Sequence, residues 1–398
     1  MAPRWLRLPG GSRVPSAPVS PSDEARVLIR CTDVPVRSSL GQYAVRVGAG
    51  VRGLLPTAVE AAAPAGRCAL ISDRTVAGLW CKEVAGILGR NGVEVVEALF
   101  PAGEASKTRE TWSRLTDVLL KAELGRDCCV VSLGGGVVGD LAGFVAATFL
   151  RGVPLVQVPT TTLAMIDASV GGKTGVDHPA GKNLVGAFHA PAEVLADPDF
   201  LDTLDIGRRA EGYAEAVKHG VILDAAYAEW LGANARELLD GDAAAVEHAV
   251  VRSVRHKAQV VSDDEFEGGR RKILNFGHTV AHALELGSGY SLPHGHAVAV
   301  GMVAEARIGE ALGWTAGGTA EAIRGVVRAF DLPDSHPLMG RIQRLAGLMI
   351  TDKKTRRGIV HMVPLRRVGR TADRLGSSVP IPGDELLRVL KHISSTFV

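Results

Sequence analysis

The sequence predicts a two-part protein, with an α/β domain in its N-terminal half and a mainly α-helical domain in its C-terminal half. The chain has 398 residues and 46% of them are hydrophobic, which is enough for two domains with substantial cores. Up to about residue 200, short apolar runs alternate with helical patterns. Beyond that point helical periodicity dominates, so the two halves are expected to differ in class.

The expected strands of the first half are apolar runs that end in turn residues, as buried parallel strands do. They are "CALISD" (68–73), "VEVVEALF" (93–100), "CCVVSLGG" (128–135) and "PLVQVP" (154–159). Helical patterns lie between them at 76–92, 106–124 and 140–152. This alternation predicts a parallel, Rossmann-like sheet flanked by helices.

The second half contains apolar residues at helical spacing in 208–223, 243–265, 278–287, 296–313 and 320–332. We therefore expect an α/β domain at 31–207 and a helical domain at 208–398, with a ligand cleft between them. Residues 1–30 lack the continuous apolar core of a secretory signal and are expected to be a disordered extension.

Composition limits the partners and the compartment. Lys and Arg number 45 against 43 Asp and Glu, so no basic excess indicates nucleic-acid binding. The longest central apolar run, "LAGFVAATFL" (141–150), is too short to span a bilayer. Five irregularly spaced cysteines argue against a disulfide framework and favour a reducing compartment. We expect a cytoplasmic protein that binds a small molecule.

A glycine loop lies between one expected strand and the next helix. Gly134, Gly136 and Gly139 have the spacing that lets backbone N–H groups approach a phosphate at the start of a helix. The acidic residue usual about twenty positions later is absent, and no Gly-Lys-Ser/Thr ending follows. The spacing alone leaves nucleotide binding and a structural turn equally open.

The stretch "DASVGGKTGVDHPAGKN" (167–183) is more informative. It places Asp167, Lys173, Lys182 and Asn183 among glycines in a largely apolar sequence. A single lysine in such a loop is usually a solvated charge. Two lysines with an acid and an amide suit an anionic, hydroxyl-rich ligand better.

Four histidines near residue 280 indicate a metal site. His278 and His282 share one helix face, and His294 and His296 follow closely. A zinc-protease motif is excluded, because Thr279 stands where that motif needs Glu. Imidazole with carboxylate suits Zn²⁺. Glu215 lies on an expected helix, where most acids with such spacing form an ordinary surface ion pair.

Further polar residues would form one cationic pocket if the helices converge. They are Lys218, Lys257, Glu267, Arg271, Asn275, Lys353 and Lys354. Each can also be explained separately as surface charge.

Taken together, these segments resemble the 3-dehydroquinate synthase family of sugar-phosphate cyclases, from about residue 35 to about residue 370. The segments that carry the resemblance are 132–152, 157–188, 214–222, 264–285 and 294–302. It implies a dehydroquinate synthase-like fold, an NAD-binding α/β domain, a helical metal-binding domain, Zn²⁺ (with Co²⁺ as a substitute) in the cleft, and a homodimer.

The resemblance also implies residue roles. The implied metal ligands are Glu215, His278 and His294. The implied NAD contacts are Asp73, Glu104, Lys107, Gly136, Val137, Val138, Gly139, Asp140, Thr160, Thr161, Lys173, Lys182, Phe200, Leu201, Asp202 and Thr203. The implied catalytic residues are Lys173, Lys218, Lys257, Glu267, Arg271, Asn275 and His282. The implied substrate contacts are Asp167, Lys182, Asn183, Arg151 and one of Lys353 or Lys354.

The implied reaction converts a seven-carbon keto-acid sugar phosphate to a carbocycle and phosphate, with transient oxidation by NAD⁺. One position departs from the family pattern: His296 stands where many members have Glu, which leaves the amino-sugar analogue or another cyclase substrate as alternatives. A metal- and NAD-dependent alcohol dehydrogenase of the glycerol-dehydrogenase type is disfavoured, because it needs no phosphate-binding lysines.

Overall fold

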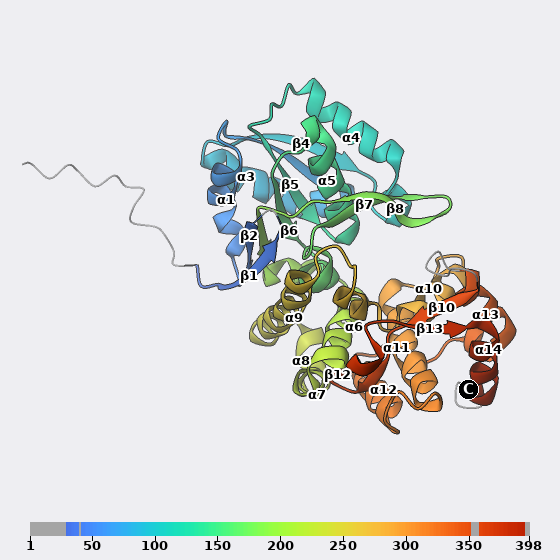
Figure 1. Cartoon of the computed structure of the whole chain (residues 1–398). Coiled ribbons are helices and arrows are strands. Elements are labelled where there is room, and N and C mark those ends of the chain that lie inside the picture. Colours follow the sequence, from blue (N-terminus) through green and yellow to red (C-terminus); the bar gives the residue numbers. More distant parts are fainter. Residues whose placement is uncertain (1–28, 40, 352–357, 395–398) are drawn as a thin grey trace, which may run out of the picture.

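A seven-stranded sheet forms the N-terminal half of the chain, with the strand order β1-β2-β9-β6-β5-β3-β4 (Figure 1). All neighbouring strands run parallel except β1 and β2. The strands are β1 (Thr32–Ser38), β2 (Gly41–Val47), β3 (Arg67–Asp73), β4 (Glu94–Phe100), β5 (Cys129–Gly134), β6 (Leu155–Pro159) and β9 (Glu193–Ala196). The predicted parallel sheet is confirmed.

The computed structural model describes residues 29–39, 41–351 and 358–394. The predictions for Lys353 and Lys354, and for nearly all of the extension at 1–30, lie outside these residues.

Helices cover both faces of the sheet because successive strand residues point to opposite sides. Leu70 belongs to a core shared with α1 (Leu55–Ala62) and α3 (Lys82–Arg90). The next residue, Ile71, belongs to a core shared with α4 (Arg109–Lys121) and α5 (Gly136–Thr148). The central strands are buried on both faces, which explains why they appear as continuous apolar runs.

The sheet reverses its winding direction between β3 and β5. The connection from β3 to β4 passes through α3 on one face, and the connection from β5 to β6 passes through α5 on the other. In open α/β sheets the crevice at the carboxyl ends of such strands binds ligands. Here that crevice lies between Asp73 and the glycine loop at Gly134–Gly136.

The C-terminal half is mainly helical, as predicted. Its helices are α6 (Ile206–Leu223), α7 (Ala225–Ala233), α8 (Ala235–Asp240), α9 (Ala243–Asp263), α10 (His278–Gly287), α11 (His294–Ala311), α12 (Thr319–Ala329), α13 (Ile342–Thr351) and α14 (Gly383–His392). Among the described helices, none is both long enough and apolar enough to cross a membrane. The domain division at residues 207 and 208 falls just inside α6 and stays a prediction.

Two small two-stranded sheets accompany these helices and were not predicted. Strands β10 (Ile359–Met362) and β13 (Val379–Pro382) pair antiparallel, and so do β11 (Leu365–Arg367) and β12 (Arg370–Thr371). Such short strands carry too few residues to show a period in the sequence.

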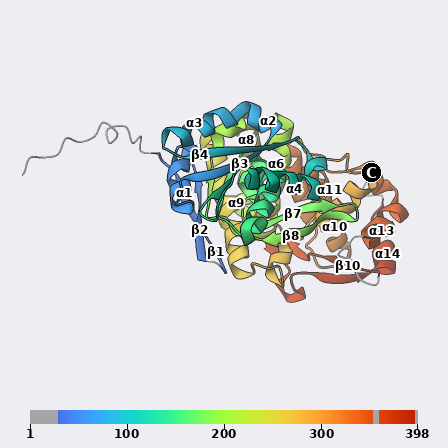
Figure 2. The ribbon, with the colours of Figure 1, turned by 90° about the horizontal axis from the view of Figure 1, so that it is seen from above.

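The glycine-rich stretch at 167–183 contributes to a hairpin of β7 (Lys173–His178) and β8 (Gly181–Phe188). The hairpin packs on α5 and extends towards α10 (Figure 1, Figure 2). It therefore carries Lys173, Lys182 and Asn183 from the sheet half towards the helical half.

Candidate active site

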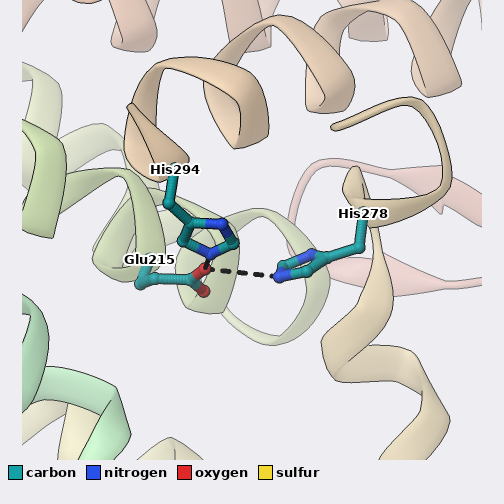
Figure 3. Close-up of side chains that lie close together, drawn as sticks. All are labelled: Glu215, His278 and His294. Atoms are coloured by element: carbon teal, nitrogen blue, oxygen red, sulfur yellow. Dashed lines mark ion pairs between the residues drawn. The ribbon is translucent and has the colours of Figure 1, made fainter. Parts of the chain in front are cut away.

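Three separate segments bring Glu215, His278 and His294 together (Figure 3). Glu215 lies in the middle of α6, and the two histidines are the first residues of α10 and α11. The Oε1 atom of Glu215 is 3.5 Å from Nε2 of His278 and 3.4 Å from Nε2 of His294. The candidate ligand atoms all lie within 4.8 Å of one another. One carboxylate and two imidazoles at this spacing fit Zn²⁺ with an open coordination position.

Backbone contacts between helices make this convergence possible. A β-carbon on Gly295 would lie 2.2 Å from the backbone oxygen of Glu211 in α6. A β-carbon on Gly301 would lie 2.0 Å from the backbone oxygen of Gly277, which precedes α10. Only glycine allows α11 to approach both neighbours this closely. The two glycines therefore place His294 over Glu215 and beside His278.

A buried carboxylate, Glu305 of α11, fixes the start of α10. It accepts hydrogen bonds from the backbone N–H groups of Gly277 (3.0 Å), Thr279 (2.9 Å) and Val280 (3.1 Å). The first N–H groups of a helix have no partner within the helix and lie at its positive end. They therefore compensate the negative charge of the buried Glu305 carboxylate. Glu305 was not predicted as a site residue. Its signal is a lone acid within the apolar run "AVAVGMVAEA" (297–306).

The electrostatics of the cluster favour a cation. Burial alone would raise the pKa of Glu215, but Lys218, His278 and His294 hold this pKa well below its usual range. Burial and the neighbouring Lys218 lower the pKa of His278 to about 4. Despite burial, Glu215 and Glu285 raise the pKa of His294 to about 10. A divalent cation would thus meet an ionised carboxylate and a neutral His278, and would displace the proton of His294.

A buried ion pair lies beside this cluster. Lys257 Nζ is 2.8 Å from Oδ1 of Asp167 and donates to the backbone oxygen of Asp167 at 2.6 Å. Asp167 belongs to η5 (Ala164–Ala168), a π-helical turn of a kind often found at functional sites. The fully buried His219, which was not predicted as a site residue, places Nε2 3.5 Å from Oδ1 of the same carboxylate.

A second group surrounds Glu267, whose φ of 61° is unusual for a residue other than glycine. Its carboxylate pairs with Lys173 and accepts a hydrogen bond from Asn275 Nδ2 at 2.6 Å. Such backbone strain is commonly retained at ligand sites.

Arg271, in η7 (Arg270–Asn275), is the largest fully buried side chain that carries a charge. Its guanidinium donates to the backbone oxygens of Gly171 (3.1 Å) and Glu265, and its buried Nε has no hydrogen-bond partner among the described residues. Carbonyl groups do not neutralise the positive charge, so Arg271 retains the capacity to bind an anion.

The predicted NAD residues follow the carboxyl ends of the parallel strands. Asp73 ends β3, where its side chain accepts from the N–H groups of Thr75 and Val76. Apart from Lys173 and Lys182 of the hairpin β7–β8, the others follow β4 (Glu104, Lys107), β5 (Gly136, Val137, Val138, Gly139, Asp140), β6 (Thr160, Thr161) and β9 (Phe200, Leu201, Asp202, Thr203). The last four form most of η6 (Pro198–Thr203), and Phe200 and Leu201 are buried. The arrangement fits a dinucleotide at the switch point.

Lys107 connects this edge to the hairpin. Its Nζ lies 2.5 Å from Oδ2 of Asp140 and 2.5 Å from the side-chain oxygen of Asn183. Lys182, the neighbour of Asn183, lies 3.8 Å from Glu104 and 3.3 Å from Glu285 of α10. The hairpin therefore connects the carboxyl edge of the sheet, where the predicted NAD residues lie, to the cluster of Glu215, His278 and His294.

Two predicted site residues, His282 and Arg151, and the histidine that departs from the family pattern, His296, need separate description. The ring centroids of His282 and His278 are 5.6 Å apart, but neither His282 nor His296 belongs to a metal-fitting group among the described residues. Arg151 lines a cavity of about 480 Å³ together with Tyr43 and His189, and no other predicted site residue lines that cavity. The predicted contact of Arg151 with the substrate stays a prediction.

Comparison with known proteins supports the family that the sequence resembles. The family model described as 3-dehydroquinate synthase N-terminal matches residues 97–210, and the one described as 3-dehydroquinate synthase C-terminal matches residues 212–355. The 3-dehydroquinate synthase of Xanthomonas axonopodis pv. citri is 48% identical over 309 residues, which cover 76% of this chain and 84% of the relative.

Two solved structures share the fold across both halves of the chain. ValA, the 2-epi-5-epi-valiolone synthase of Streptomyces hygroscopicus, has NAD⁺ and Zn²⁺ bound, and matches with a TM-score of 0.79 and 26% identity over 89% of this chain and 97% of its own. A 2-deoxy-scyllo-inosose synthase complexed with carbaglucose-6-phosphate, NAD⁺ and Co²⁺ matches with a TM-score of 0.79 and 26% identity over 91% and 99%.

Proposed function

Because the chain belongs to the 3-dehydroquinate synthase family, we propose that it converts 3-deoxy-D-arabino-heptulosonate 7-phosphate to 3-dehydroquinate and inorganic phosphate. This carbon–oxygen lyase reaction belongs to the shikimate pathway of aromatic amino acid biosynthesis. The observation that carries the proposal is one site that combines Glu215, His278 and His294 with the buried cations Lys218, Lys257 and Arg271. A homodimer in the cytoplasm remains part of the proposal.

The residues present fit both groups that such a reaction needs. Glu215, His278 and His294 would hold Zn²⁺ or Co²⁺, and the carboxyl edge of the sheet would hold NAD⁺. When bound, NAD⁺ supplies a reversible hydride acceptor, and the cation lowers the pKa of the substrate hydroxyl that is oxidised.

The chain's own side chains bind and orient the anionic ends of the substrate. Arg271 offers a planar guanidinium that matches a carboxylate. Lys173 lies on the hairpin and Asn275 on the facing segment η7. The carboxylate of Glu267 contacts both side chains and orients them. Lys257 adds a buried positive charge fixed by Asp167. Because these groups are already oriented, substrate binding needs little reorganisation of the site.

Proton transfer needs fewer dedicated groups than binding does. We assign His282 and Asn275 to hydrogen bonding and proton relay near the phosphate, whose own oxygen can help to take the proton that is lost on elimination. Lys218 forms an ion pair with Glu215 and stabilises the negative charge of its carboxylate. The burial of Lys218, Lys257 and Arg271 keeps water away from this part of the site.

The proposal predicts a redox-neutral reaction. Purified protein with Zn²⁺, a trace of NAD⁺ and the sugar phosphate should release one phosphate per substrate without lasting absorbance from NADH, because the hydride is returned in each turnover. Phosphate release and NADH absorbance are recorded together, with the hydroxy and the amino form of the substrate. The hydroxy form should react faster.

Stoichiometric accumulation of NADH would replace the proposal by a dehydrogenase, and faster turnover of the amino form would change the substrate. The His294→Ala variant is the matched control, since it should retain the fold but lose phosphate release.

A further inference from the structure

The two candidate ligand histidines differ in what their second ring nitrogen contacts. His278 places Nδ1 3.2 Å from the backbone oxygen of Phe276, two residues earlier. His294 places Nδ1 3.4 Å from Oε1 of a carboxylate, Glu285. That carboxylate lies in the last turn of α10, and only 4% of the residue is exposed. The imidazole of His294 therefore lies between two carboxylates, Glu215 and Glu285.

We propose that Glu285 is a positioning residue for His294. Its carboxylate accepts a hydrogen bond from Nδ1–H, which fixes the tautomer and leaves the lone pair of Nε2 directed at the cation beside Glu215. Ligand histidines commonly depend on such a partner, which fixes the ring and increases its basicity. The inference rests on the metal-ligand set of the proposed function.

The position of Glu285 in its helix argues against a role in helix stability. An acid in the last turn meets the negative end of the helix, where a cation is favoured. The other buried acid of this helix pair, Glu305, occupies the opposite, favourable end of α10, where it accepts hydrogen bonds from three backbone N–H groups. Glu285 is thus buried where helix electrostatics oppose it, and its side-chain partners must compensate.

Those partners come from both halves of the chain. Lys182 of the hairpin β7–β8 donates from Nζ to Oε1 of Glu285 at 3.3 Å, and its Nζ also lies 5.1 Å from the ring centroid of Tyr290. Oε1 of Glu285 thus has a nitrogen from each half of the chain within 3.4 Å, Nζ of Lys182 and Nδ1 of His294. One carboxylate therefore ties a metal ligand to the hairpin from the sheet half.

The test compares Zn²⁺ affinity, by competition with a chelator in the absence of NAD⁺, and the visible absorption of the Co²⁺ form. Glu285→Ala should weaken Zn²⁺ binding by about 10–100-fold and change the Co²⁺ spectrum, because His294 loses its orienting partner. Glu285→Gln keeps an acceptor oxygen without the charge and should restore part of the affinity. Glu321→Gln, an exposed acid on α12, is the matched control and should bind both metals like the wild type.

Wild-type affinity and spectrum in Glu285→Ala, with only a lower unfolding temperature of the metal-free protein, would overturn the inference. If Glu285→Ala does not fold, Glu285→Gln decides, since an unchanged affinity and spectrum there would also overturn it. Equal metal binding by the wild type and His294→Ala would overturn the ligand set and this inference together. Absence of phosphate release, with the expected metal response, would count against the proposed function alone.

Discussion

Lys257 shows at the level of one residue how burial changes a charge. Burial, together with Arg271 and Lys218, lowers the pKa of Lys257 to about 8 even though Asp167 opposes the shift. In an unfolded chain the pKa of a lysine is about 10.4. The folded protein therefore releases this proton at a lower pH than the unfolded chain does.

This difference predicts a pH dependence of stability. Below about pH 8 both states keep the proton, and the buried charge lowers the free energy of unfolding by a constant amount. Between about pH 8 and 10.4 the unfolded chain binds more protons, so the contribution of Lys257 to stability rises with pH. Denaturant unfolding of metal-free wild type and Lys257→Met at several pH values should show the wild type gaining stability relative to the variant in this window.

Parallel pH curves for the two proteins would contradict the lowered pKa. Lys121→Met, which removes an exposed lysine at the end of α4, is the control and should follow the wild-type curve at every pH.

At the level of elements, the site depends on how closely α11 approaches α6. Gly295 stands between His294 and His296, and a methyl group there would overlap the backbone oxygen of Glu211. Backbone atoms cannot move aside as a flexible side chain can. The helix contact, and not a loop, therefore sets the distance between Glu215 and His294.

Gly295→Ala should accordingly separate the two helices. We expect a loss of about 1–3 kcal/mol in the free energy of unfolding, as is usual for overpacking. Zn²⁺ affinity should fall as well, because the ligand geometry is disturbed. Calorimetry and metal titration measure the two effects.

Gly325→Ala is the matched helical control. A β-carbon at Gly325 of α12 would meet no atom within 4 Å, so alanine there should be neutral or stabilising by up to about 1 kcal/mol. Wild-type metal affinity in Gly295→Ala would show that α11 can shift without disturbing the site.

At the level of the whole molecule, one core joins the two halves. A single cluster of buried residues includes Val45 of β2, Leu70 of β3, Val217 of α6 and Val298 of α11. The second cluster lies on the opposite face of the same sheet strands. The sheet half thus has this second core to itself, but among the described residues the helical half has no apolar core separate from the one it shares with the sheet.

This continuity predicts cooperative unfolding. Metal-free protein should unfold in one transition, with coincident midpoints for helix loss by circular dichroism and for tryptophan fluorescence, which reports on both halves through Trp112 and Trp230. The calorimetric and van't Hoff enthalpies should agree. Two resolved transitions would show that the sheet half and the helical half are independent folding units.

Much of the fold could be predicted because its signals are local. Apolar runs with β-branched residues predicted the parallel strands, and helical spacing predicted α6, α9, α10 and α11. The short strands β10 to β13 lack such a period and were missed. The hairpin β7–β8 was recognised only as a ligand-binding stretch, since its many glycines conceal the alternation of a strand.

By itself, the sequence determined the fold class, the candidate cationic residues and the histidines that could bind a metal, because residue type and spacing carry that information. Helical spacing alone left His278 and His282 as equal candidates, since both lie on one helix face, and only the family resemblance favoured His278 as the ligand. Only the tertiary structure brought Glu215, His278 and His294 within ligand distance, and placed Glu285 beside His294 and Glu305 at the start of α10. The physical reason is that these contacts join residues far apart in the chain, and the packing of glycine-lined helices decides which side chains meet.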